Sequence, residues 1–172
     1  DEDRQHIVIE KMNAYLGRYQ FLLMDLGAGI SNTVLTFART THHRLVVITP
    51  EPTSLTDSYA LIKVLNTRYD LKDFHVLVNM VQSEDEAVAG YERLRAACDR
   101  FLGLSIGYIG HVRRDDVVSE SVRRQKAFLR FSPSAQASED IYRIIEKLME
   151  LRNGSRSILS GRPPLSLDET ML

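Results

Sequence analysis

Short, uninterrupted apolar runs separated by stretches of helical periodicity constrain the fold of this chain more than any other feature. Four such runs occur, at residues 21–26, 45–49, 74–81 and, more weakly, 104–110. Runs this short and this apolar suit strands that are buried on both faces, as in a parallel sheet covered by helices. We therefore expect an α/β fold with a mostly parallel sheet flanked by helices.

The stretches between these runs carry apolar residues at the three- and four-residue spacing of a helix face. These residues are Ile30, Val34, Phe37 and Ala38; Leu61, Val64 and Leu65; Ala87, Tyr91, Leu94, Cys98 and Phe101; Val118, Val122 and Gln125; and Ile141, Ile144, Ile145 and Leu148. Ser54 followed by Asp57 resembles a capping box for the second of these helices. Alternating strands and helices with short connections predict right-handed βαβ units.

Length and composition favour one globular domain followed by a tail. The 172 residues suffice for a real core, and a net charge of −1 with 26% charged residues excludes a polyanion-binding tail. No apolar stretch approaches the roughly 18 residues that cross a bilayer. The lone Cys98 lies on a helix stripe, so we expect it to be buried, and its isolation suits the cytoplasm. We expect a domain over residues 1–152 and a flexible or docked tail over 153–172, where Asn153-Gly154 and Pro163-Pro164 interrupt a helix.

The first apolar run leads into a candidate phosphate and metal site. Asp25 ends the run, and Gly27 and Gly29 bracket the turn that follows it. A carboxylate at the carboxyl end of a parallel strand faces the ligand crevice, where it can hold a hydrated metal beside a phosphate. The glycines would let the backbone bend close to that phosphate. The alternative is that Asp25 caps the next helix and the glycines serve only the turn.

Three segments in order carry a resemblance to a known family. They are Asp25-Leu26-Gly27-Ala28-Gly29-Ile30-Ser31, the block from Thr49-Pro50-Glu51-Pro52 to Ala60, and Val78-Asn79-Met80-Val81. Together they resemble the MinD/ParA family of deviant Walker ATPases, over about residues 5–150, and within it the FlhG branch of flagellar-number regulators. The resemblance implies a P-loop NTPase fold, ATP or ADP with Mg²⁺ as cofactor, and a homodimer in the ATP state.

The same resemblance implies a location and partners. It predicts a cytoplasmic protein with possible peripheral contact to the inner membrane, and flagellar assembly proteins such as an FlhF-like GTPase as partners. It also assigns roles to the first two segments. Asp25 would hold Mg²⁺ through water, and the turn from Gly27 to Gly29 would sense the γ-phosphate. Glu51 and Asp57 would face the partner subunit of the dimer, where Glu51 can reach the partner's nucleotide.

The remaining implied roles concern the base of the nucleotide. Asn79 matches the asparagine that reads the adenine edge, and its side chain offers the donor and acceptor that this role needs. Its alternative role is that of a turn former at a strand end. In the next loop Arg113 stands where the family has a proline, and Asp115 keeps the acidic position. Arg113 can stack on a base as a cation–π partner, so base binding is expected, while selectivity for adenine is not implied.

The largest departure from the family is that this sequence lacks the family's phosphate loop. Only 24 residues precede Asp25, and they contain no Gly-Lys-[Ser/Thr]. We therefore expect the carboxyl-terminal half of an ATPase domain, without its amino-terminal phosphate-loop half and inactive alone, since that loop supplies most of the phosphate charge compensation. The strand that leads into the loop would lie between runs 21–26 and 45–49. We expect these runs to pair with each other or with another molecule, or a separate polypeptide to supply the strand.

Two further features carry weaker hypotheses. The adjacent His42 and His43 are discounted as a metal pair, because neighbours on a loop point apart and no Cys or carboxylate cluster accompanies them. The segment 113–130 concentrates basic residues, as a solvated face or as a site for nucleotide phosphate, acidic lipid or DNA. Three functions therefore compete: half of a nucleotide-switched flagellar regulator, a non-catalytic interaction module, or a ParA-like non-specific DNA binder, with DNA the weaker candidate.

Overall fold

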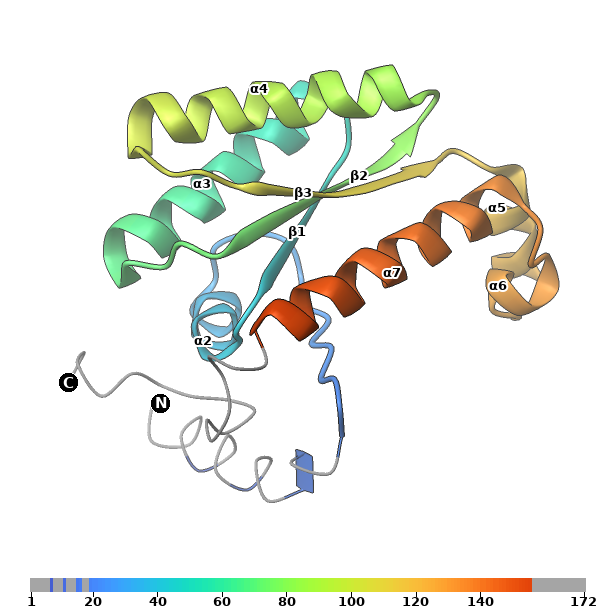
Figure 1. Cartoon of the computed structure of the whole chain (residues 1–172), viewed down its shortest axis with the longest axis horizontal. Helices are drawn as coiled ribbons and strands as arrows, with labels where there is room; N and C mark the ends of the chain where they lie inside the picture. The colour runs from blue at the N-terminus through green and yellow to red at the C-terminus, as the bar shows by residue number, and fades with distance from the viewer. Residues whose placement is uncertain (1–6, 8–10, 12–14, 17–18, 156–172) are drawn as a thin grey trace.

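The computed structural model describes residues 7, 11, 15–16 and 19–155 and contains a three-stranded parallel sheet (Figure 1). The strands are β1 (Arg44–Ile48), β2 (Phe74–Val81) and β3 (Gly107–Arg113), in the order β1-β2-β3. The helices are α2 (Asn32–Thr40), α3 (Pro52–Tyr69), α4 (Glu84–Leu102), α5 (Asp116–Arg123), α6 (Phe128–Phe131) and α7 (Gln136–Ser155). Strands and helices alternate along the chain, so the expected α/β fold class is confirmed.

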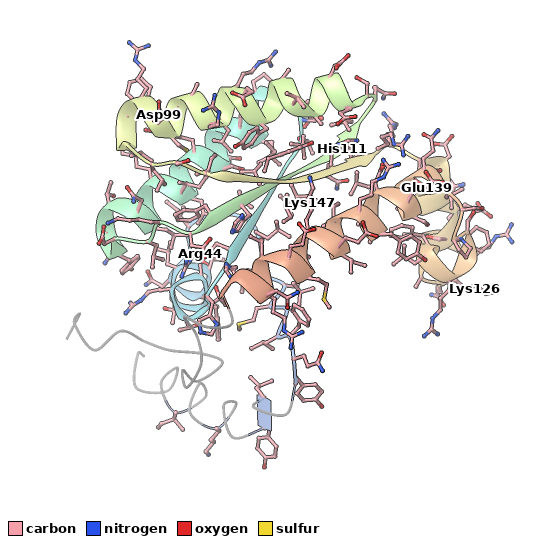
Figure 2. The ribbon with its side chains drawn as sticks, in the orientation of Figure 1. Arg44, Asp99, His111, Lys126, Glu139 and Lys147 are labelled. Atoms are coloured by element: carbon pink, nitrogen blue, oxygen red, sulfur yellow. The ribbon has the colours of Figure 1, made fainter. Side chains whose placement is uncertain are left out.

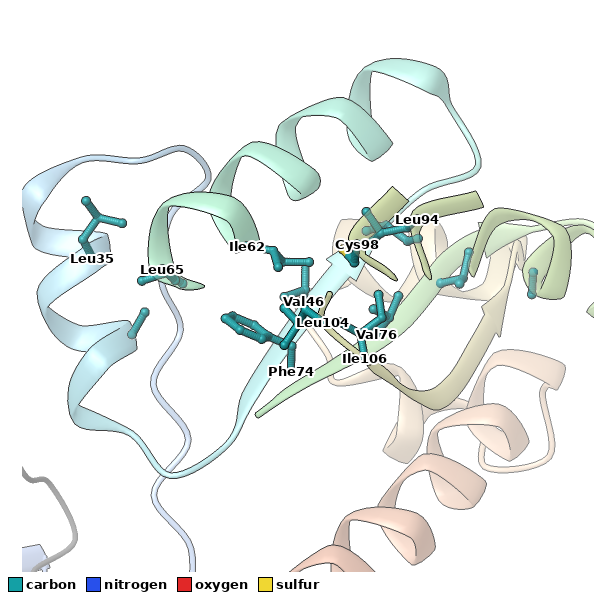
Figure 3. Close-up of a cluster of buried hydrophobic side chains, with 14 of the residues drawn as sticks. Leu35, Val46, Ile62, Leu65, Phe74, Val76, Leu94, Cys98, Leu104 and Ile106 are labelled. Carbon is teal, nitrogen blue, oxygen red and sulfur yellow. The ribbon is translucent and has the colours of Figure 1, made fainter. Parts of the chain in front are cut away.

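Helices cover both faces of the sheet. Figure 1 shows α3 and α4 along one face and α7 along the other, with α2 beside α3 at the β1 side. The larger core lies under α3 and α4 and includes Phe74, Val76 and Val78 of β2 (Figure 3). Leu77 belongs instead to the smaller core beneath α7. Both faces of β2 are thus buried, which explains why its run is apolar without alternation.

Local sequence signals set several helix ends. Ser83 caps α4 by accepting a hydrogen bond from the Glu86 amide at 3.2 Å, and Ser31 caps α2 in the same way. Gly103 ends α4 in the left-handed conformation, with φ of 59°. The expected capping box at Ser54 and Asp57 is wrong, because α3 already begins at Pro52. Ser54 Oγ instead accepts a hydrogen bond from the Thr49 amide at 2.9 Å and ties the helix to the end of β1.

The strand expected at residues 21–26 is not formed. The segment is irregular, and its side chains alternate between exposed and half-buried, with Leu23 86% exposed and Leu26 packed on the larger core. A strand needs a neighbour for its backbone hydrogen bonds. In the described part of the chain β1 pairs only with β2, so no ladder extends to this segment. The expected direct pairing of runs 21–26 and 45–49 is therefore absent, and pairing with another molecule stays a prediction.

Three other expectations have clear outcomes. Cys98 is fully buried, as expected, and burial raises the pKa of its thiol to about 11. Helix α7 continues through Gly154 to Ser155, beyond the break expected at Asn153. The expected tail lies mostly outside the described residues, at 156–172. Among the described helices, none combines the length and the hydropathy that crossing a membrane requires.

Candidate functional site

Four of the expected site residues lie at one edge of the sheet. Glu51 follows β1, Asn79 lies near the end of β2, Arg113 ends β3, and Asp115 begins the next helix. The three strands are parallel, so their carboxyl ends meet at this edge. In open α/β sheets this is where ligands bind. We call it the carboxyl edge.

Asn79 shapes the end of β2. Its side-chain oxygen accepts a hydrogen bond from the Met80 amide at 2.9 Å, and Met80 has a positive φ of 59°. The pairing with β3 shifts between Asn79 and Val81, so Met80 is a bulged residue. The turn-forming role of Asn79 is thus present. Its amide nitrogen makes no hydrogen bond within the described part of the chain, so both N–H donors of the Asn79 side chain remain available for a base.

Arg113 is held by helix α7. Its Nε and Nη2 each lie 2.8 Å from a different carboxylate oxygen of Asp140, and its backbone amide donates to the same carboxylate at 2.9 Å. The Asp140 side chain is only 1% exposed. Burial raises the pKa of Asp140, but the hydrogen bonds and charge of Arg113 lower it more, so the net pKa lies below its usual range. This pairing uses the in-plane donors of the guanidinium, whose flat faces are what stacking on a base requires.

Asp115 joins two helices. One of its carboxylate oxygens accepts from the Val117 amide at 3.0 Å and caps α5, and the other accepts from the Ala137 amide at 3.2 Å in the first turn of α7. Two structural hydrogen bonds therefore account for the acidic residue at this position. Whether Asp115 also contacts a nucleotide stays a prediction.

Glu51 and Asp57 are exposed at the start of α3. Glu51 occupies the N-cap position without a side-chain cap, and its carboxylate lies 3.3 Å from the Thr49 hydroxyl. Asp57 lies six residues, or about 1.7 turns, further along the helix. Helix α4 packs closely against this region, since a Cβ at Gly90 would lie 3.7 Å from Val78 and 4.0 Å from Pro50. Both carboxylates are thus accessible on a rigid support, which a partner face needs.

Asp25 and its glycines lie in the irregular segment before α2. Asp25, Gly27 and Gly29 are exposed, and Gly29 has a φ of 99° that other residues rarely adopt. The turn predicted from the glycines is therefore present. The position of Asp25 at the end of a strand is wrong, because no strand forms there. No hydrogen bond or ion pair within the described residues joins Asp25 to the carboxyl edge, and its magnesium role stays a prediction.

The basic segment 113–130 is partly neutralised by carboxylates. Arg113 pairs with Asp140, while Arg124 and Arg123 approach Glu120 at 2.6 and 3.5 Å. The other basic residues of this segment are Arg114, Lys126 and Arg130. Lys126 and Arg130 line a shallow pocket beside Phe131. The pairing favours a solvated face over a continuous site for a polyanion.

Sequence reasoning missed a cluster at the opposite edge of the sheet, where the strands begin. His43 Nδ1 lies 2.6 Å from one carboxylate oxygen of Asp73, and His75 Nε2 lies 2.8 Å from the other. Burial raises the pKa of Asp73, but the hydrogen bonds and charges of the two imidazoles lower it by a larger amount. The net pKa is therefore well below its usual range. A possible signal was the Asp-x-His pattern at the start of the run 74–81, beside a histidine just before the run 45–49.

The fold and the carboxyl edge define a class: a parallel α/β domain with polar residues gathered where its strands end. Sequence similarity to known proteins narrows this class. The chain is 36% identical over 127 residues to the antiactivator FleN of Pseudomonas aeruginosa, covering 74% of this chain and 45% of FleN. It is 30% identical over 145 residues to the flagellum site-determining protein YlxH of Helicobacter pylori, covering 83% of this chain and 49% of YlxH. No family model matches the chain.

These similarities confirm the resemblance predicted from the motifs. Over most of its length the chain is homologous to FleN and YlxH, which are flagellar proteins of the FlhG type in the MinD/ParA family. The chain spans about half the length of the curated relatives that it matches. The activity, substrates and partners of a whole protein of this type are therefore matters for proposal.

Proposed function

We propose that this chain is part of a MinD/FlhG-type regulator that controls the number or the position of flagella. The observation that carries the proposal is the 36% identity with the antiactivator FleN across 127 residues. The similarity to a flagellum site-determining protein supports the same assignment from a second organism. Both matches cover most of this chain.

In this proposal the carboxyl edge takes part in an ATP switch. Asn79 would donate its free amide nitrogen to the adenine, and the flat face of Arg113 would stack on the ring. Asp25 would hold hydrated Mg²⁺ while the turn around Gly29 follows the γ-phosphate. The nucleotide would also need a phosphate loop, which these 172 residues do not contain.

The switch would act through assembly. Glu51, at the N-cap of α3, and Asp57, in its second turn, are both exposed, as residues at the face of an ATP-dependent homodimer should be. The dimer would then contact flagellar assembly proteins such as an FlhF-like GTPase, in the cytoplasm or peripherally at the inner membrane. These partners and this location follow from the family resemblance.

The two other candidate functions have less support. A non-specific DNA binder needs a continuous cationic face, but at least three cations of segment 113–130 approach carboxylates. A non-catalytic interaction module would use the exposed α3 face without nucleotide. Insensitivity to ATP would distinguish that module from the switch.

A replacement experiment tests the proposal. The matched region of P. aeruginosa FleN is exchanged for the corresponding residues of this chain, and flagella per cell are counted by electron microscopy in a strain that lacks FleN. The strain with FleN and the strain without it supply the two reference counts. We expect the chimera to restore the count, and a chimera with Asn79→Ala to restore it less. A folded, stably produced chimera that leaves the count unchanged would refute the proposal.

A further inference from the structure

The cluster at the beginning of the strands contains three metal-ligand side chains from two segments of the chain. One ligand atom from each of His43, Asp73 and His75 lies within 4.8 Å of the other two. His43 precedes β1, and Asp73 and His75 flank the first residue of β2. We propose that His43, Asp73 and His75 bind one divalent transition-metal ion, such as Zn²⁺, at the edge of the sheet opposite the carboxyl edge.

Strand register brings these residues together. Arg44 pairs with Phe74 and Leu45 with His75, so the residues one step earlier, His43 and Asp73, lie side by side. Asp73 and His75 are two residues apart on a strand, which places both side chains on the same face. Leu77, next in this alternation, belongs to the core beneath α7. The three ligands therefore share the α7 face, and the pairing of β1 with β2 holds them there.

Neighbouring groups fix the position of the cluster. Arg44 donates hydrogen bonds to the carbonyl oxygens of Ala38, Thr41 and Asp73 at 2.9, 2.5 and 3.3 Å. These bonds join the loop that carries His43 to the backbone of Asp73. Figure 2 shows Arg44 where β1 meets α2, far along the sheet from Glu139. Arg44 therefore holds the loop before β1 against the start of β2.

Gly107 of β3 leaves room for the His75 ring. A Cβ at position 107 would lie 2.7 Å from His75 Nδ1, which is closer than side chains tolerate. The His75 side chain is 16% exposed, compared with 32% for His43 and 41% for Asp73. The site is thus closed on the β3 side and open beside Asp73. A metal with three protein ligands would complete its coordination there with water.

The distances suit a metal after a small adjustment. Four-coordinate Zn²⁺ with bonds of about 2.0–2.1 Å separates its ligand atoms by roughly 3.3 Å. The present nitrogen–oxygen contacts of 2.6 and 2.8 Å are shorter than this. A rotation of the half-exposed Asp73 carboxylate that moves its oxygens by about half an ångström would admit the ion. Each ring nitrogen would then present its lone pair to the metal. Two imidazoles and one carboxylate favour Zn²⁺, Co²⁺ or Ni²⁺ over Mg²⁺.

The competing explanation is that Asp73 only bridges two imidazoles without a metal. Direct binding measurements on the full chain, freed of any affinity tag and treated with chelator, distinguish the two. We expect isothermal titration calorimetry at neutral pH to show one Zn²⁺ per chain, and excess Mg²⁺ to give no competing signal. Bound Co²⁺ should show the intense visible absorption of a four-coordinate ion. Saturating Zn²⁺ should raise the melting temperature by about 5 °C or more.

Matched variants locate the ion. His43→Gln, Asp73→Asn and His75→Gln should each weaken Zn²⁺ binding at least about tenfold and remove the Co²⁺ absorption. His111→Gln is the control, because His111 lies on β3 against Tyr108 and outside the cluster. Circular dichroism establishes that each variant is folded. Absence of binding to the unmodified chain, or equal binding by the control and all three cluster variants, would overturn the proposal.

Discussion

The two edges of the sheet differ in how their polar groups are used. At the carboxyl edge the motif residues already make structural hydrogen bonds. Asp115 and Arg113 are bound to helix α7, and the side-chain oxygen of Asn79 accepts from the Met80 amide. At the opposite edge the sequence offers only the short Asp-x-His pattern, yet strand register assembles three ligand groups. A motif therefore indicates where polar residues gather. The hydrogen bonds that they already make determine which atoms remain for a ligand.

The largest expected effect concerns Asp25, which has no tie to the carboxyl edge in the described structure. In the FleN chimera, which supplies a phosphate loop, Asp25→Asn should lower ATP turnover about a hundredfold or more, because it removes the charge that holds hydrated Mg²⁺. Asp99→Asn on the exposed side of α4 is the matched control and should have no effect. The isolated 172-residue chain should show no turnover. Turnover by that chain, lost on Asp25→Asn, would contradict this assignment.

The Arg113–Asp140 pair should be the strongest structural tie at the carboxyl edge. Asp140→Ala leaves the guanidinium without its buried partner and should lower the free energy of unfolding by about 3 kcal/mol. Glu139→Ala is the control, since its carboxylate is 3.8 Å away and 53% exposed, and should cost less than about 0.5 kcal/mol. Urea unfolding followed by circular dichroism measures both. Equal losses for the two variants would show that this edge is not held by the pair.

Particular residues show how far sequence alone predicts this molecule. The run 74–81 has the bounds of β2, because burial on both faces makes most of the strand apolar, with His75 and Asn79 as its polar residues. The run 21–26 fails, because a strand also needs a neighbour that a sequence pattern cannot display. Asn79 and Glu51 were found because their segments resemble those of the MinD/ParA family. His43 and Asp73 are thirty residues apart in sequence, and only the register of β1 with β2 makes them neighbours.

Asn79 tests whether the carboxyl edge binds a base. In the FleN chimera, Asn79→Ala should weaken ATP binding roughly tenfold to a hundredfold, the value of about 1–3 kcal/mol for one buried hydrogen-bonding group. The preference for ATP over GTP should fall as well. Asn66→Ala is the control, because Asn66 makes a similar side-chain hydrogen bond to Leu71 away from this edge. Unchanged affinity and selectivity would leave Asn79 with its turn-forming role alone.

The smallest expected effect is a pH dependence of stability. Burial raises the pKa of Asp140, but the hydrogen bonds and charge of Arg113, together with the charge of His111, lower it more, so the pKa is lower in the folded protein. Its stabilisation should therefore be complete above the ordinary carboxyl pKa of about 3.9 and be lost as pH falls through the lower folded value. Asp140→Asn should flatten this part of the stability profile. An identical acid profile for both proteins would show that other carboxylates dominate.

Hydrogen exchange with two ligands compares the edges most directly. Exchange is measured by mass spectrometry on the FleN chimera alone, with ATP and Mg²⁺, and with Zn²⁺. We predict that nucleotide slows exchange around residues 79–81 and 113–116, whereas Zn²⁺ slows it around 41–45 and 73–76. Nucleotide binding that leaves the carboxyl edge unprotected, or protection of the same peptides by both ligands, would contradict the assignment of nucleotide to one edge and metal to the other.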